Sequence, residues 1–80
     1  MYNVQVTVMP LNDLLDPQGK AVLGGLQNLG IHSIHDVRVG KHIALSIEAA
    51  SAEDAKAIAE NASKQLLANQ VMEFFEIAII

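Results

Sequence analysis

The sequence Tyr2-Asn3-Val4-Gln5-Val6-Thr7-Val8 alternates apolar and polar side chains without a break. Because successive side chains in a β-strand point to opposite faces, this alternation predicts a strand with one buried face. Pro10 follows shortly after and lacks the N–H group that a sheet ladder needs, so we expect the strand to end there. The chain therefore begins with a half-buried strand.

A helix is predicted to follow the first loop. Asp16 can accept hydrogen bonds from the free N–H groups of a first helical turn, and Pro17 suits the first helical position. The apolar stripe consists of Val22, Leu26 and Leu29. Gly30 is a plausible C-terminal stop. These features together predict a helix between Asp16 and Gly30.

Two glycines, Gly24 and Gly25, lie inside this predicted helix. Each costs roughly 1 kcal/mol of helix stability relative to alanine. We therefore expect that another part of the structure lies close against this turn, or that the helix is locally weak.

The middle of the chain predicts a β-hairpin. One strand is expected at residues 34–39 and another at residues 42–48, joined by a short turn at Gly40-Lys41. The residues that share one face of the second strand are Ile43, Leu45 and Ile47. Gly40 is expected to meet the conformational demand of the turn.

A second helix is predicted to begin after Ser51, which can cap it, and to end near Asn69. Asp54, three residues after the cap, gives a weaker version of a capping box. The expected apolar stripe consists of Ala55, Ile58, Ala59, Ala62 and Leu66. Because adjacent helical residues point about 100° apart, Leu67 is expected to face outward when Leu66 faces the core.

Residues 71–80 predict a final strand with apolar side chains on both faces. One face carries Phe75, Ile77 and Ile79, and the other carries Met72, Phe74, Ala78 and Ile80. A strand of this kind should be covered on both faces. The second set are therefore our candidates for self-association.

The predicted element order is β-α-β-β-α-β over residues 1–80, in a single domain. This order predicts an α+β, ferredoxin-like sandwich, with a four-stranded antiparallel sheet and both helices on one face. The bare face would then meet another copy, as a homodimer or a homotetramer.

Composition argues against several classes of function. The net charge is -4, and the five basic residues are scattered, so no basic patch for nucleic acid is evident. There is no cysteine, which excludes disulfides and thiolate sites. No apolar run approaches the ~20 residues of a membrane helix, and no signal peptide is visible. These features suit a cytoplasmic protein that does not bind membranes.

No catalytic or metal-binding constellation stands out in the sequence. His32, His35 and His42 could supply imidazoles for zinc, but the first two fall at a loop-to-strand junction, where their spacing does not align the side chains. We expect solvated or edge-strand histidines. The first loop is acidic and apolar, the wrong sign for the phosphate site of an acylphosphatase, and Arg38 is the only arginine. We expect no catalytic, cofactor-binding or metal site in this chain.

Four stretches in register carry a resemblance to a known family. They are Leu15-Asp16-Pro17-Gln18-Gly19-Lys20-Ala21-Val22, Asp36-Val37-Arg38-Val39-Gly40-Lys41, Leu45-Ser46-Ile47-Glu48, and Leu66-Leu67-Ala68-Asn69 with Val71-Met72-Glu73 after it. In this order and over this length, the chain resembles the PurS family, the small subunits of phosphoribosylformylglycinamidine synthase.

The resemblance implies a non-catalytic assembly subunit in de novo purine biosynthesis. PurS is expected to bridge the large synthetase subunit, PurL, and the glutaminase subunit, PurQ, so that ammonia can pass between them. The complex would be a ligase that uses ATP, Mg²⁺ and glutamine, whereas this chain alone would bind none of them.

The stretches also suggest residues that contact partners. The candidates are Asp16, Gln18, Gly19, Arg38, Lys41 and Leu67. Each has a simpler alternative, such as helix capping or a solvated side chain. Two other functions stay open from the residues alone: a ligand-sensing module like an ACT domain, and a stand-alone enzyme.

Overall fold

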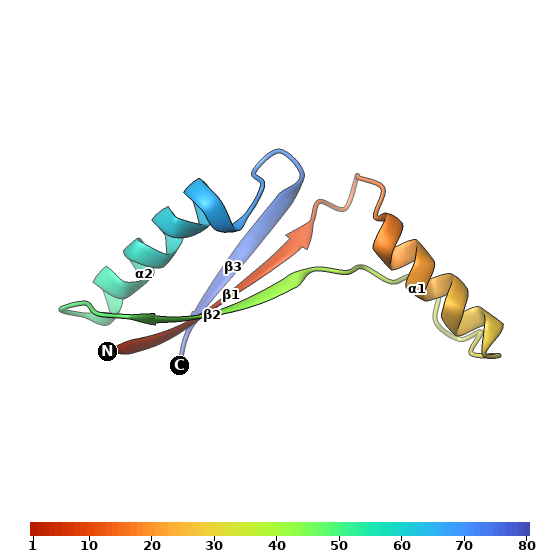
Figure 1. The fold of residues 1–80 in the computed structure, drawn as a ribbon, viewed down its shortest axis with the longest axis horizontal. Helices are drawn as coiled ribbons and strands as arrows, with labels where there is room; N and C mark the ends of the chain where they lie inside the picture. The colour runs from red at the N-terminus through yellow and green to blue at the C-terminus, as the bar shows by residue number, and fades with distance from the viewer.

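The computed structural model describes residues 1–80 and shows an α+β fold (Figure 1). Its elements are β1 (Tyr2–Pro10), α1 (Pro17–Asn28), β2 (Lys41–Ile47), α2 (Ala52–Ala62), the π-helical turn η1 (Ser63–Leu67) and β3 (Glu73–Ile79). Neither helix has the length and apolar character that crossing a membrane requires. The α+β class is as predicted, but the number of strands is not. The ferredoxin-like packing of both helices on one sheet face is also wrong, because only α2 packs on the strands.

The sheet has three antiparallel strands in the order β2-β1-β3, so the four-stranded prediction is wrong. Val8 lies opposite Lys41, and the same register would place Val39 opposite Pro10. Residues 34–38 therefore lie beyond the end of β1, where no strand is available to pair with them. Pro10, which ends β1 as predicted, thus also removes the expected fourth strand.

The predicted hairpin turn at Gly40-Lys41 is also absent. The chain enters β2 directly from the preceding segment, and Gly30 is the only residue with positive φ. Gly40 instead allows a close approach, because a Cβ there would collide with the Val8 carbonyl oxygen and Met9 Sδ. The glycine is therefore explained by the close approach of the returning segment to the end of β1 and not by a turn.

The core lies between one face of the sheet and α2. Val4, Val6 and Val8 are almost completely buried, which confirms the alternation predicted for the first strand. Val4 packs with Ala55 and Ala59, and the small side chains let α2 approach the sheet closely. The opposite face of the sheet is bare within this chain, as Figure 1 shows.

The end of the second helix departs from the prediction. Leu66 is 84% exposed, whereas Leu67 packs against the cluster of Val6, Val8 and Ala68. The expectation that Leu67 faces outward is therefore wrong. In η1 the Ala68 N–H donates to the Ser63 carbonyl at 3.0 Å, five residues back, and this wider turn keeps Ser63 and Leu67 on the buried side.

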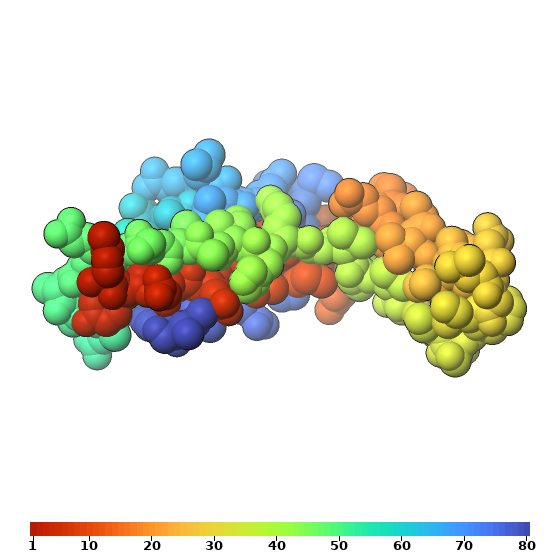
Figure 2. Space-filling view, turned by 60° about the horizontal axis from the view of Figure 1, so that its bottom comes forward, coloured from red at the N-terminus to blue at the C-terminus, as the bar shows by residue number.

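Residues 11–40, which we call the arm, project away from the sheet (Figure 2). The arm consists of α1 and the extended segment that returns beside it to β2 (Figure 1). The molecule measures 51 × 25 × 14 Å, and its radius of gyration is 15.9 Å. A compact domain of this length would have a radius of gyration of about 12 Å. We call the sheet together with α2 and η1 the body.

Candidate functional site

The arm joins the body where two chain segments lie side by side, and we call this region the neck. The outgoing segment is residues 10–19, and the returning segment is residues 36–40. Between Met9 and Ser46, only Asp16 and Gly19 are buried. The neck is therefore the one closely packed place in this half of the molecule.

Asp16 ties the two segments together with both carboxylate oxygens. Oδ1 accepts from the Gly19 N–H at 3.1 Å, which confirms the predicted cap of α1. Oδ2 accepts from the Val39 N–H at 2.8 Å, across the neck. The hydrogen bond from Val39 contributes most to lowering the pKa of this carboxyl below its ordinary value of 3.8, followed by that from Gly19. Asp16 is therefore an anion at neutral pH.

Arg38 makes the reciprocal connection from the returning segment. Its guanidinium group donates to the carbonyl oxygens of Leu11 at 2.6 Å and Leu14 at 3.2 Å, with a longer contact to Pro10 at 3.5 Å. Arg38 Nε is buried without a partner. The side chain therefore organises the loop between β1 and α1, so its charge is less available to a partner than the sequence suggested.

Gly19 lies where the two segments approach most closely. A Cβ at this position would collide with the Val37 carbonyl oxygen and crowd the Asp16 carboxylate, which lies 2.6 Å from it. Gln18, one residue earlier, is exposed. Of these two predicted partner contacts, Gly19 has a packing role inside the neck, whereas Gln18 is free to meet another chain.

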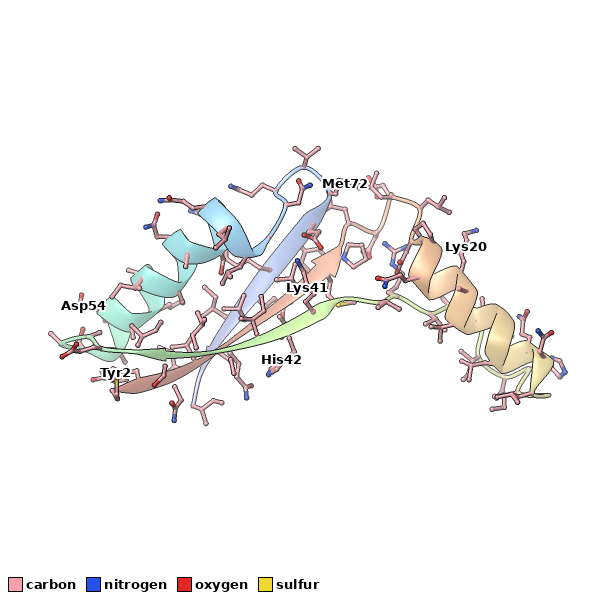
Figure 3. All side chains as sticks on the ribbon, viewed as in Figure 1. Tyr2, Lys20, Lys41, His42, Asp54 and Met72 are labelled. Atoms are coloured by element: carbon pink, nitrogen blue, oxygen red, sulfur yellow. The ribbon has the colours of Figure 1, made fainter.

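Lys41 and Leu67 lie together on the body side of the neck. Lys41 Nζ donates to the Leu67 carbonyl at 3.2 Å and lies 3.7 Å from Glu73 Oε1. The Lys41 side chain is 54% exposed, so the ion pair is weak and the charge remains accessible. Figure 3 shows Lys41 against the sheet, well separated from Lys20 on the arm.

Two open hollows flank the loop between β1 and α1. One, of about 370 Å³, lies between Asp13, Lys20 and Asp36. The other, of about 300 Å³, runs along Pro17, Gln18, Asn69 and Met72. Leu15 contributes to both and is two-thirds exposed.

Leu15 was not singled out as a contact residue from the sequence. A signal was nevertheless present, because the residue before a helix cap often packs on the fourth helical residue, which here is Lys20. Lys20 offers no apolar partner for this leucine, and the side chain stays exposed.

The structure gathers no group of three histidine, aspartate or glutamate side chains that could hold a metal ion. His32, His35 and His42 are all exposed. Of the self-association candidates, Phe74, Ala78 and Ile80 lie exposed along β3 and its end, whereas Met72 borders the neck.

Comparison with known proteins identifies the family. Residues 3–80 match the family model described as "PurS: Phosphoribosylformylglycinamidine (FGAM) synthase". The chain belongs to the PurS family. Because the match covers nearly the whole chain, the resemblance noted in the four sequence stretches is confirmed.

Individual relatives agree with this assignment. The PurS subunit of phosphoribosylformylglycinamidine synthase from Synechocystis sp. is 42% identical over 72 residues, which cover 90% of this chain and 72% of that protein. The solved structure of Bacillus subtilis PurS is 36% identical, with a TM-score of 0.89 and coverage of 100% of this chain and 99% of the other. A chain in the structure of PurLQS from Thermotoga maritima is 28% identical, with a TM-score of 0.91, and the match covers 99% of this chain and 96% of that one.

Proposed function

We propose that this chain is a non-catalytic assembly subunit of phosphoribosylformylglycinamidine synthase, acting in purine biosynthesis in the cytoplasm. Membership of the PurS family and the similarity to a chain of the Thermotoga PurLQS structure support this role. The observation that carries it is the arm, which has an exposed apolar surface and whose helix α1 makes no substantial contact with the strands or with α2. A small chain built in this way is suited to binding other chains.

Self-association is the first part of the proposal. The accessible surface of the chain is 5608 Å², whereas a compact monomer of 8.6 kDa would expose about 4,700 Å². On the arm, Val22, Leu29 and Ile31 are exposed, and Leu29 is 77% exposed. We propose that a second copy covers the arm and the apolar strip along β3 in a homodimer or a homotetramer.

The second part concerns the larger partners. The chain would hold PurL and PurQ together, so that ammonia released from glutamine passes between their active sites. ATP, Mg²⁺ and glutamine would be bound by those subunits. In this chain Gln18 and Lys41 are the candidate contacts with accessible polar groups.

The proposal is tested by co-purification from the organism's own cells. Tagged protein should recover a large synthetase and a glutaminase, and the complex should persist through size-exclusion chromatography. Recovery of neither partner would refute the assembly role. Sedimentation of the isolated chain should give at least a dimeric mass, and a monomeric mass at micromolar concentration would refute self-association.

The proposed contact between Lys41 and the synthetase can be tested by comparing two lysine substitutions. Lys41→Gln removes an accessible charge beside the neck, and Lys56→Gln removes one from the exposed side of α2. We expect the first change to weaken binding to the synthetase by about fivefold, or about 1 kcal/mol, and the second to leave it unchanged. Equal dissociation constants for the two variants, measured by calorimetry, would remove Lys41 from the interface.

A further inference from the structure

The arm keeps a defined direction although little apolar packing holds it. α1 makes no substantial contact with any strand or with α2. The buried residues at the neck are a charged aspartate and a glycine, instead of the apolar side chains that bury the body. The Leu11 N–H donates to the Met72 carbonyl at 2.8 Å, so the outgoing segment is held next to β3. The direction of the arm then depends on what ties the returning segment to the outgoing one.

Two side chains cross the neck in opposite directions. Asp16, at the start of α1, accepts from the backbone of the returning segment at Val39. Arg38, on the returning segment, donates to the backbone of the outgoing segment at Leu11 and Leu14. Each side chain thus ties its own segment to the other, and together they prevent the two segments from sliding or twisting independently.

The ties involve charged groups, which makes them stronger than ordinary hydrogen bonds. Hydrogen bonds to an ionised donor or acceptor are roughly twice as strong as those between neutral groups. Both side chains are at least partly shielded, because Asp16 is 8% exposed and the bonds of Arg38 are partly buried. The close approach at Gly19 leaves no room for the segments to shift against each other.

We propose that Asp16 and Arg38 form a rigid joint that sets the direction in which the arm projects. The two residues are positioning residues: they act on a partner through the arm and need not touch it. A joint of this kind lowers the conformational entropy lost when another chain docks on the arm, because the arm is already oriented.

One substitution can remove the hydrogen bond from Val39 and still leave the cap of α1 in place. In Asp16→Asn the amide oxygen can still accept from Gly19, since asparagine caps helices as well as aspartate. The amide nitrogen would face the Val39 N–H, and two donors cannot bond to each other. Asp13→Asn is the matched control, because Asp13 is an exposed carboxylate of the same loop with no hydrogen bond to the neck.

The direction of the arm can be measured by electron–electron double resonance. The chain contains no cysteine, so spin labels at Asn28→Cys and Lys56→Cys report only the end of α1 and the surface of α2. An excess of unlabelled protein isolates distances within one chain. Circular dichroism and urea unfolding of each variant show that the body is folded.

In the parent protein and in Asp13→Asn we expect one narrow distance distribution. Asp16→Asn should widen it about twofold or more, because the arm would sample orientations that the tie excludes. An unchanged width in Asp16→Asn, or equal widening in Asp13→Asn, would overturn the proposal. If Asp16→Asn does not fold, Arg38→Lys, which keeps the charge but loses the fork of donors, is judged by the same criterion.

Discussion

At the scale of single residues, the chemistry of this molecule is concentrated in Asp16. The carboxylate has two oxygens and uses them on two different chain segments, one as a helix cap and one as a link across the neck. Only the ionised form keeps both oxygens as acceptors, because protonation turns one of them into a donor and both partners are backbone N–H groups. The behaviour of the neck should therefore follow the charge of this one group.

The pH dependence has a definite sign. Since folding lowers the pKa of Asp16, the carboxylate stabilises the folded chain above its ordinary pKa of 3.8, and this contribution is lost as the pH falls through the lower folded value. The free energy of unfolding of the parent chain, minus that of Asp16→Asn, should be constant from about pH 7 to about pH 5 and shrink below about pH 4. Urea unfolding across this range measures it.

Taking the difference in free energy of unfolding between the parent chain and Asp16→Asn cancels the acid sensitivity of the other carboxylates, which both chains share. A difference that is the same at all pH values would show that the charge of Asp16 does not contribute. Asp13→Asn provides the control, because it removes an exposed carboxylate of the same loop that is not bonded to Val39 or Gly19.

The cap of Asp16 could be predicted from sequence, whereas its link to Val39 could not. Capping is a local pattern, with Pro17 next and Gly19 three residues on. Val39 is 23 residues away, and its position depends on where β1 ends. For the same reason Arg38 was expected at a surface, although its guanidinium lies on the carbonyls of the first loop.

At the scale of elements, two outcomes differ from the sequence prediction. The end of β1 determines that residues 34–39 form no strand, and the wide turn of η1 determines which leucine is buried. Residues 34–39 have the composition of a strand but lack a partner, because pairing stops at the end of β1. Leu66 and Leu67 exchange roles because η1 is wider than an α-helical turn. Neither outcome follows from hydrophobic spacing alone, since both depend on packing that is distant in sequence.

The two leucines give a direct comparison at this scale. Leu67→Ala should lower the free energy of unfolding by about 1–3 kcal/mol, because it removes a partly buried side chain from the cluster around Val6 and Val8. Leu66→Ala should change it by less than about 0.5 kcal/mol, because the side chain is exposed. Urea unfolding measures both changes. A larger loss of stability in Leu66→Ala than in Leu67→Ala would contradict the position of η1.

Substitution of a glycine in α1 can show whether another chain packs against the arm. Within one chain, nothing lies within 4 Å of where a Cβ would be at Gly24 or Gly25, so the predicted close neighbour is absent. Gly25→Ala should therefore raise helix stability by about 0.5–1 kcal/mol in any state where the arm is free.

If a second copy packs on this turn, the same change should weaken self-association. Sedimentation over a range of concentrations, together with unfolding of the diluted chain, separates the two effects. A more stable chain with unchanged association would show that the second copy lies elsewhere.

At the scale of the whole molecule, the shape indicates function more clearly than any cluster of side chains does. The chain is extended, and its arm and one sheet face lack cover from the rest of the chain. The apolar character of residues 71–80 on both faces already indicated this from sequence. The projecting arm was not predicted from the sequence, because the ferredoxin-like fold that we expected would pack the first helix on the sheet.

The central claim, that this chain assembles other subunits without catalysing a step, is tested most directly by measuring the nitrogen source of the reconstituted synthase. PurL, PurQ and this chain should convert formylglycinamide ribonucleotide with glutamine or with free ammonia. Without this chain, we predict that the glutamine-dependent reaction is lost and the ammonia-dependent reaction of PurL persists. Loss of both reactions, or of neither, would contradict the account.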